Sequence, residues 1–400
     1  MKIAYGVHGY SRGHATRALS VLQSLSERHE VMVLAGGDAY DLLAPQFPVK
    51  KIPCLGFSYR GKTRSNWQTL CDNAPSFIDL FRHGRSVQQV SGALRDFGAE
   101  AVISDAEPWT HRAAQRLRIP RIGFDHFGIL VHCRVGLPSS DWAKGLVDRF
   151  MYRFLTRSPE KVLVSSFFRA EPMRPGVEII GPILREQVRS AQATRGKHLL
   201  AYFNQGTAQV SDSVLDALAG SGLPVKLYGT QREGEVGNLQ FRPAGLQPFL
   251  GDLASCRAVV STAGNQLVGE AMALAKPILA IPETTVEQRL NAREIVRLGI
   301  GEQTGLEELS ASVIKGFLTR SEGYARRALV EARDGQSQAV EILERWFREL
   351  SQAPARSRWG KALGAPVSAA EASVCAANVR AANVRAANVS QQAAGISSVG

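Results

Sequence analysis

Hydrophobic positions in the first part of the chain alternate between two spacings. Short apolar runs typical of buried strands lie at residues 3–7, 31–34, 101–103 and 121–124. Between the first two runs, residues 15–28 repeat apolar side chains at the three- and four-residue spacing of a helix that buries one face. This alternation predicts an α/β fold with a parallel, doubly wound sheet, in which ligands bind at the carboxyl ends of the strands.

A second series of the same kind begins near His198. Its strand-like runs lie at residues 199–203, 225–228, 239–241, 258–260 and 278–281. Between the two series, Gly181-Pro182 breaks the local structure. We therefore expect two Rossmann-like domains that face each other across a cleft, residues 1–165 and 186–325, joined by a linker at 166–185.

The C-terminal part of the chain changes character twice. Residues 321–350 have a helical pattern, and we expect 326–350 to form a closing helix. Residues 351–400 are rich in Ala and Ser, and the sequence Ala-Ala-Asn-Val-Arg occurs at 376–380 and again at 381–385. This segment has too few large apolar side chains to offset the entropy of ordering, so we expect a disordered tail.

The composition narrows the class of partner. Lys and Arg number 48 against 36 Asp and Glu, a net charge of +12, which favours anionic ligands or surfaces. The chain has no block of five or six basic residues, so a nucleic-acid partner is disfavoured. Its five cysteines are scattered and it lacks a signal-peptide pattern and a long apolar run, so we expect a cytoplasmic protein.

The segment 261–270 carries the strongest functional pattern. It follows a strand-like run and leads into a helix, and such a turn offers free backbone N–H groups and a positive helix end to a phosphate. Glu270 lies in the helix, where its carboxylate is suited to accept hydrogen bonds from a ribose diol. The residues of this segment predicted to bind the ligand are Thr262, Ala263, Gly264, Asn265 and Glu270.

Further motifs follow in a recognisable order. Downstream come a strand-like run, then Glu287-Gln288 and Asn291-Ala292. The order resembles the nucleotide-sugar half of GT-B glycosyltransferases, most closely the family that includes the bacterial lipid-II-forming enzyme and the UDP-glycosyltransferases. This resemblance implies a nucleotide-sugar donor, by analogy UDP-linked, with Glu287 and Gln288 on the sugar hydroxyls. It also implies that the loop around Gly206 (residues 203–207) holds the diphosphate.

The loop after the first strand contains candidates for a general base. In order it presents His8, Arg12, Gly13 and His14. The related enzymes carry a Gly-His pair in this loop, which maps onto Gly13-His14, with one extra residue in the loop here. Because a neutral imidazole is the usual base near pH 7, His14 is the predicted base, with His8 as its competitor. The run Arg-Gly-His-Ala-x-Arg at 12–17 also resembles a group of uncharacterised bacterial and archaeal GT-B proteins.

Acidic residues follow the strand at 101–103. Asp105 and Glu107 are predicted to emerge at the same sheet edge as His14, because the carboxyl ends of parallel strands meet there. A base histidine needs an orienting carboxylate, so Asp105 is the predicted partner, with helix capping as the alternative role. There is no strict Asp-x-Asp motif. We expect neither an essential metal ion nor a cofactor.

These residues together suggest an inverting hexosyltransferase, in which a base activates an acceptor hydroxyl and a nucleoside diphosphate leaves. Three alternatives stay open: a sugar-nucleotide epimerase of the same fold, a non-catalytic nucleotide-binding protein, and a nucleic-acid-modifying transferase.

The acceptor side is indicated only by two segments. Residues 57–67 mix aromatic and basic side chains, and 142–157 form an amphipathic basic helix with an apolar ridge from Trp142 to Phe154. Such a helix can lie on an anionic membrane, which suggests a lipid-linked or membrane-proximal acceptor and a peripheral location at the inner membrane face. The alternative is an ordinary helix whose apolar ridge faces the core.

Overall fold

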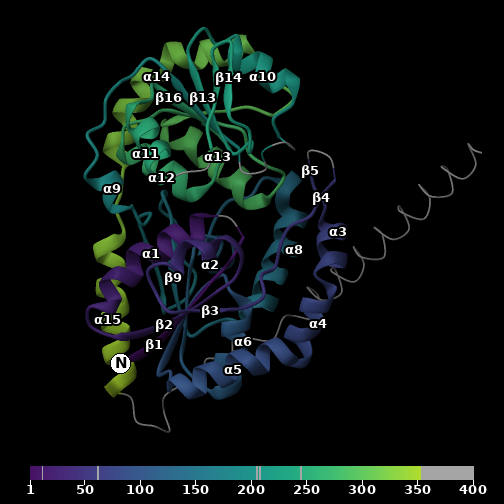
Figure 1. The fold of residues 1–400 in the computed structure, drawn as a ribbon, viewed down its shortest axis with the longest axis vertical. Coiled ribbons are helices and arrows are strands. Elements are labelled where there is room, and N and C mark those ends of the chain that lie inside the picture. Colours follow the sequence, from purple (N-terminus) through teal and green to yellow (C-terminus); the bar gives the residue numbers. More distant parts are fainter. Residues whose placement is uncertain (11, 61–62, 204–205, 207–208, 244–245, 353–400) are drawn as a thin grey trace, which may run out of the picture. The chain divides into compact units, whose positions relative to one another are not determined.

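The computed structural model (Figure 1) describes residues 1–352 except 11, 61–62, 204–205, 207–208 and 244–245. The predictions for the tail, and for Asn204, Gln205 and Thr207 of the diphosphate loop, concern residues outside this description. The structure contains two seven-stranded sheets, one built from the first half of the chain and one from the second.

The first sheet is entirely parallel, with the strand order β11-β9-β7-β6-β1-β2-β3. Its strands are β1 (Lys2–Val7), β2 (Glu30–Ala35), β3 (Val49–Lys51), β6 (Ala101–Asp105), β7 (Arg121–Asp125), β9 (Lys161–Ser165) and β11 (Val177–Ile180). Strands β1, β6, β7 and β9 are almost wholly buried, which explains their continuous apolar runs. The strand order reverses between β1 and β6, so a ligand site is expected at their carboxyl ends.

Helices and two short hairpins complete the first half. The helices are α1 (Arg12–Ser26), α2 (Gly37–Leu43), α3 (Asn66–Asp72), α4 (Ala74–Arg82), α5 (Arg85–Phe97), α6 (Pro108–Leu117), α7 (Ile129–His132) and α8 (Ser139–Thr156). The hairpins pair β4 (Tyr59–Arg60) with β5 (Thr63–Arg64), and β8 (Cys133–Arg134) with β10 (Glu171–Pro172).

The second sheet has the order β14-β15-β13-β12-β16-β17-β18 and is parallel except for its edge strand β14. Its strands are β12 (Leu199–Tyr202), β13 (Val225–Tyr228), β14 (Gly234–Val236), β15 (Leu239–Phe241), β16 (Ala258–Ser261), β17 (Ile278–Ala280) and β18 (Gly301–Gln303). Its helices are α9 (Glu186–Arg189), α10 (Asp212–Ala219), α11 (Leu246–Ser255), α12 (Asn265–Ala273), α13 (Val286–Leu298) and α14 (Ala311–Glu331). Here the order reverses between β12 and β16, which makes their carboxyl ends the second expected site.

The α/β class and the two parallel Rossmann-like sheets expected from the sequence are confirmed. The closing helix differs in detail, because the pattern at 321–350 is two helices rather than one. Helix α14 continues to Glu331 and packs on the second sheet, and α15 (Gln336–Gln352) begins after a break. Helix α15 packs on α1, where Gln336 donates to the Ser20 carbonyl at 2.8 Å, so the chain returns to the first sheet.

The apolar ridge expected on the helix at 142–157 faces the protein along only part of its length: Leu146, Phe150 and Phe154 are half-buried, and the Phe154 ring packs against Phe77 of α4. The fully buried residues of helix α8 are Asp141, Gly145, Tyr152 and Thr156. Trp142, at the start of the expected ridge, is 60% exposed. Two polar contacts hold helix α8 in this orientation, because Tyr152 donates to the buried Asp125 at 2.5 Å and Asp141 pairs with Arg289 at 2.7 Å.

Candidate active site

The first candidate site lies where the strand order reverses in the first sheet. Asp105 ends β6 and is fully buried, and His14 lies in the first turn of α1, directly after β1. The His14 Nδ1 and the Asp105 Oδ1 are 2.6 Å apart. Because a carboxylate accepts hydrogen bonds, Nδ1 carries the proton and donates it, which leaves Nε2 as the basic atom. No described residue hydrogen-bonds to Nε2, and the His14 side chain is 25% exposed.

A third residue that the sequence analysis missed completes this cluster. Arg17 lies one turn after His14 on α1 and is buried, and its Nε donates to Asp105 Oδ2 at 2.9 Å. A second donor, Nη2, bonds Oδ1, so the pair is bidentate. The three-residue spacing of His14 and Arg17 was the available signal, because it places both side chains on one helix face.

The charges around this cluster separate the two candidate bases. Burial alone raises the pKa of Asp105, but Arg17 and His14 outweigh it and hold that pKa below its ordinary value. Burial, with a further contribution from His14, lowers the pKa of His8 to about 3. His8 lies edge-on to His14, with ring centroids 5.3 Å apart. So weakly basic a group is a poor proton acceptor at neutral pH, which favours His14 over His8.

Of the two other residues predicted to belong to this site, Glu107 has a different position from that expected. Glu107 does not face the site: it is buried and caps α6, accepting hydrogen bonds from the Trp109 and Thr110 amides at 2.9 and 2.7 Å. The first helical turn needs such an acceptor, and this requirement explains the position of Glu107. Arg12 begins α1, and its side chain lies outside the described part of the structure.

The second candidate site is the N-terminus of α12, after β16. Gly264 is the N-cap, and a Cβ atom placed on it meets no atom within 4 Å. Its φ of −72° does not require glycine either, so the missing side chain simply leaves space at the helix end. Thr262 and Ala263 are buried behind it. An open, amide-bearing helix N-terminus is suited to an anion.

The Asn265 side chain has a structural contact in place of the expected ligand contact. Its Nδ2 donates to the Ser165 carbonyl and its Oδ1 accepts from the Phe167 amide, both at 3.1 Å. Ser165 ends β9 of the first sheet, so Asn265 ties α12 to that sheet. An anion bound at this helix end would therefore contact the backbone amide of Asn265 and not its side chain.

Glu270 is buried and already paired. Arg185, in the segment that joins the two halves, donates through Nε to Glu270 Oε1 at 2.7 Å and through Nη2 to Oε2. Gln266 donates to Oε1 as well, at 2.9 Å. Glu270 is 1% exposed, so the predicted contact with a ribose would require Arg185 to move.

Glu287 and Gln288 lie in the first turn of α13, close to the first sheet. The Gln288 Oε1 accepts from the Glu283 amide at 3.0 Å. Asn291 Nδ2 donates to Glu287 Oε1 at 2.6 Å, and Asn291 Oδ1 lies 3.0 Å from His126 Nε2, just beyond β7. Glu287 is thus positioned by a chain of contacts that begins on the first sheet.

Gly206 has a packing role that requires glycine. Its φ is +41°, and a Cβ atom there would lie 2.2 Å from the Gly229 carbonyl oxygen. Gly229 in turn approaches the Phe203 carbonyl, with a φ of +90°. The two glycines let Gly206 lie against the end of β13, the neighbour of β12 in the second sheet.

The two candidate sites adjoin each other. A Cβ atom on Gly13, the neighbour of His14, would lie 3.8 Å from the Gln266 Cβ in the first turn of α12. The helix that carries the candidate base therefore starts beside the helix whose N-terminus is open to an anion. Two Rossmann-like domains that bring a histidine–aspartate pair to such a helix end define a GT-B glycosyltransferase.

Residues 1–321 match the family model described as glycosyl transferase family 1, and the chain belongs to this family. No curated protein sequence matches the chain.

Solved glycosyltransferase structures share the fold. MurG of Acinetobacter baumannii is 15% identical, with a TM-score of 0.54, over 86% of this chain and 99% of that one. Phytolacca americana UGT2, complexed with UDP-2fluoro-glucose and pterostilbene, is 13% identical with a TM-score of 0.62 over 86% and 99%. The calicheamicin glycosyltransferase CalG4 is 16% identical with a TM-score of 0.58 over 88% and 99%.

Proposed function

We propose that this glycosyltransferase moves a hexose-type sugar from a nucleotide sugar, most simply a UDP-sugar, to a hydroxyl acceptor with inversion and without a metal ion. The observation that carries the proposal is the His14–Asp105 contact of 2.6 Å beside the open N-terminus of α12. The first element supplies a base and the second supplies an anion site, as a direct displacement at an anomeric carbon requires.

Each group has one task in the proposed step. His14 Nε2 takes the proton of the acceptor hydroxyl as that oxygen attacks the anomeric carbon. Asp105 holds the imidazole in the tautomer that leaves Nε2 basic. The glycosidic bond breaks with its electrons going to the diphosphate, whose charge the α12 amides and helix dipole stabilise. The attack comes from the face opposite the leaving group, which inverts the anomeric configuration.

Glu270, Glu287 and Gln288 are proposed to hold the donor's ribose and sugar hydroxyls. Support comes from Phytolacca americana UGT2, a protein of similar fold whose structure is a complex with UDP-2fluoro-glucose. In our proposal Glu270 must exchange Arg185 for the ribose, because both of its oxygens accept from Arg185.

A nucleotide panel tests the donor site. Thermal unfolding is followed with each nucleoside diphosphate and nucleotide sugar in the presence of EDTA, for the wild type and Gly264→Asp. We expect one nucleotide to stabilise the wild type, and the carboxylate placed at the α12 N-terminus to abolish that effect. Stabilisation that disappears on adding EDTA would contradict metal independence, and no stabilisation by any nucleotide would contradict the donor assignment.

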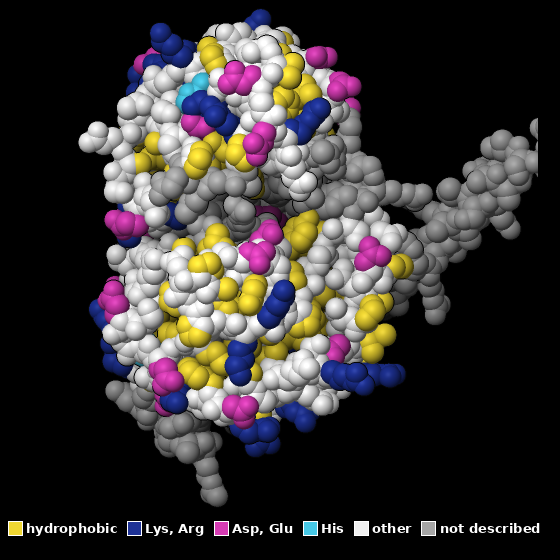
Figure 2. All heavy atoms as spheres, viewed as in Figure 1, with side chains coloured by type: hydrophobic (Ala, Val, Ile, Leu, Met, Phe, Trp, Pro, Cys, Tyr) yellow, Lys and Arg dark blue, Asp and Glu magenta, His cyan; other side chains and the backbone are white. Residues whose placement is uncertain are grey.

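We further propose that the acceptor is presented at a membrane surface. An exposed apolar surface on α3 and α4 consists of Leu70, Ile78 and Phe81, which are 46%, 55% and 65% exposed. Figure 2 shows hydrophobic side chains over these helices. Arg82 ends α4, and Arg85 begins α5. Apolar side chains flanked by bases suit an anionic bilayer.

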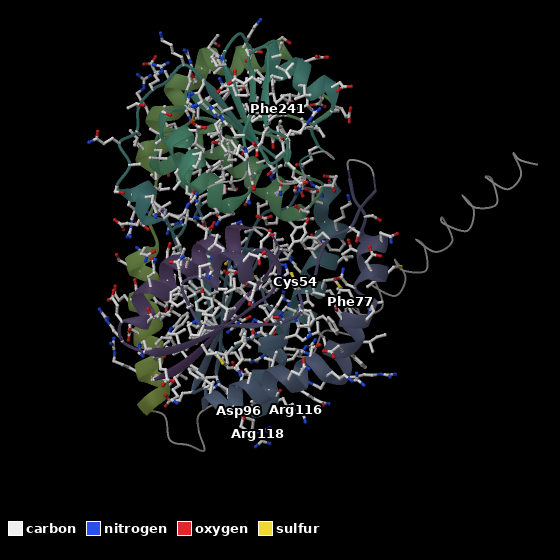
Figure 3. All side chains as sticks on the ribbon, in the orientation of Figure 1. Cys54, Phe77, Asp96, Arg116, Arg118 and Phe241 are labelled. Carbon is white, nitrogen blue, oxygen red and sulfur yellow. The ribbon has the colours of Figure 1, made fainter. Side chains whose placement is uncertain are left out.

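The inner side of the same helix is fixed to the protein. Phe77, labelled in Figure 3, packs its ring against Phe154 of α8 with centroids 6.4 Å apart, and Leu80 is fully buried. Helix α4 is therefore anchored by one face, which leaves Ile78 and Phe81 outward. None of the helices in the described residues is long and apolar enough to cross a bilayer.

Flotation with anionic liposomes tests this surface. We expect Ile78→Ser/Phe81→Ser to lose binding that the wild type shows at low salt. Val330→Ser is the matched control, because Val330 is 74% exposed on α14 of the second half. Equal flotation of the double variant and the wild type would rule out this surface.

A further inference from the structure

A simple pair of a base and a carboxylate contains no residue equivalent to Arg17. Several contacts hold the Arg17 side chain in place. Its side chain is 4% exposed and bonds both oxygens of Asp105. The guanidinium carbon also lies 6.0 Å from the centroid of the Phe124 ring on β7. These contacts fix the guanidinium in a site that is almost wholly withdrawn from the surface.

The guanidinium also lies beside the candidate base. Arg17 Nη2 is 3.0 Å from His14 Nδ1, too close for both to be cationic without a substantial electrostatic penalty. Both face the same carboxylate, Asp105, which carries one negative charge. With Arg17 present, that charge is already neutralised before His14 takes up a proton.

The other described titratable groups around the cluster do not supply the positive charge with which Arg17 neutralises Asp105. Burial, Asp105 and Asp125 together keep Tyr5 protonated by raising its pKa well above its ordinary value, and burial raises the pKa of Asp125. Burial lowers the pKa of His126 to about 4, as it lowers that of His8 to about 3, so both rings are neutral at pH 7. Tyr152 hydrogen-bonds Asp125 and is likewise kept protonated. At neutral pH, Arg17 is therefore the permanent cation of this group.

We propose that Arg17 is a positioning residue that keeps His14 neutral and basic while Asp105 still orients it. A carboxylate alone orients a histidine but also favours its protonated form, which is useless as a base. A buried arginine that shares the carboxylate removes the second effect and keeps the first, because the Nδ1–H to Oδ1 hydrogen bond remains. This inference rests on the proposed role of His14 as the base.

Histidine side-chain NMR measures the effect directly, without an acceptor or any turnover. The titration midpoint of His14, assigned with His14→Gln, is compared among three folded variants. We expect Arg17→Met to raise the midpoint by roughly one to three pH units, since removing a like charge at this range favours protonation. We expect Asp105→Asn, which leaves Arg17 unpaired, to lower it. Arg17→Lys keeps the charge without the two-pronged geometry, and should stay close to the wild type.

The outcomes separate the inference from the function on which it rests. An unchanged midpoint in Arg17→Met, or a rise in Arg17→Lys as large as in Arg17→Met, would overturn the inference. If Arg17→Met does not fold, as far-UV circular dichroism would show, Asp105→Asn and Arg17→Lys decide. Once a donor and acceptor are known, the acid limb of kcat/KM should move with the midpoint. If the midpoints shift as expected but the protein has no transferase activity, the proposed function is refuted and the inference about Arg17 is not.

Discussion

The pair between Arg185 and Glu270 offers the sharpest test of how the donor site is built. Both side chains are largely withdrawn from water, with 11% and 1% of their surfaces exposed. Replacing one partner leaves the other charge buried without compensation, which costs about 3–5 kcal/mol, whereas replacing both by apolar residues removes that penalty. We therefore expect Arg185→Met and Glu270→Met each to lose about 3–5 kcal/mol of stability, and the double variant to lose no more than either.

A neighbouring ion pair supplies the control for this cycle. Arg189 and Glu186 pair on α9, where their side chains are 33% and 69% exposed. Such solvated pairs contribute less than about 1 kcal/mol, so the corresponding methionine variants should change stability little. Chemical unfolding followed by circular dichroism, at one pH and salt concentration, gives all of these values. Additive losses in the Arg185 and Glu270 variants would refute the claim that the two charges depend on each other.

The same variants report on the nucleotide. If ribose takes the place of Arg185 on Glu270, then Arg185→Met removes the competitor and should tighten nucleoside diphosphate binding, while Glu270→Met should weaken it. Calorimetric titration of the two folded variants measures this difference. Weaker binding by Arg185→Met would show that the arginine holds the nucleotide itself and does not compete with it.

Three further predictions follow from the site geometry. His14→Gln should lower kcat by about 10²–10⁴, the usual contribution of a general base, whereas His8→Gln should leave the pH profile of kcat/KM in place; steady-state kinetics distinguishes them. Burial raises the pKa of Glu107 from 4.5 to about 7, so between these pH values the folded chain retains a proton that the unfolded chain releases. The free energy of unfolding should therefore fall by about 3 kcal/mol as the pH rises from 4.5 to 7. In chemical unfolding, Glu107→Gln should remove this pH dependence. Gly206→Ala should destabilise the protein by more than 1 kcal/mol, roughly the minimum for a strained backbone with a clash, whereas Gly264→Ala should not, as thermal unfolding will show.

The sequence predicted the framework well because apolar spacing is a local signal. The predicted runs at 101–103 and 225–228 coincide with β6 and β13. The exposed edge strands β3 and β14 lack a continuous apolar run, and nothing in their pattern marked them. The break between α14 and α15 was missed for a similar reason, since Ala332 to Gly335 interrupts the helical pattern for only about one turn.

The site was only partly readable, because pairing between distant residues is not a local property. Asp105 was expected beside His14, since both follow neighbouring strands, and the structure brings them together. The spacing of Glu107 was equally compatible with facing the site, but capping α6 took precedence. The partner of Glu270 is 85 residues away, so only the folded chain reveals it.

The return of α15 makes the first domain discontinuous in the chain. His29 on the first half lies 3.0 Å from Glu344 of α15, and Lys161 pairs with Glu349 at 2.9 Å, while Trp346 is buried there. During synthesis the first sheet must therefore wait for the whole second half before its last surface is covered. A fragment ending at the linker would expose that surface, so dissection of the two halves calls for a fusion that restores α15.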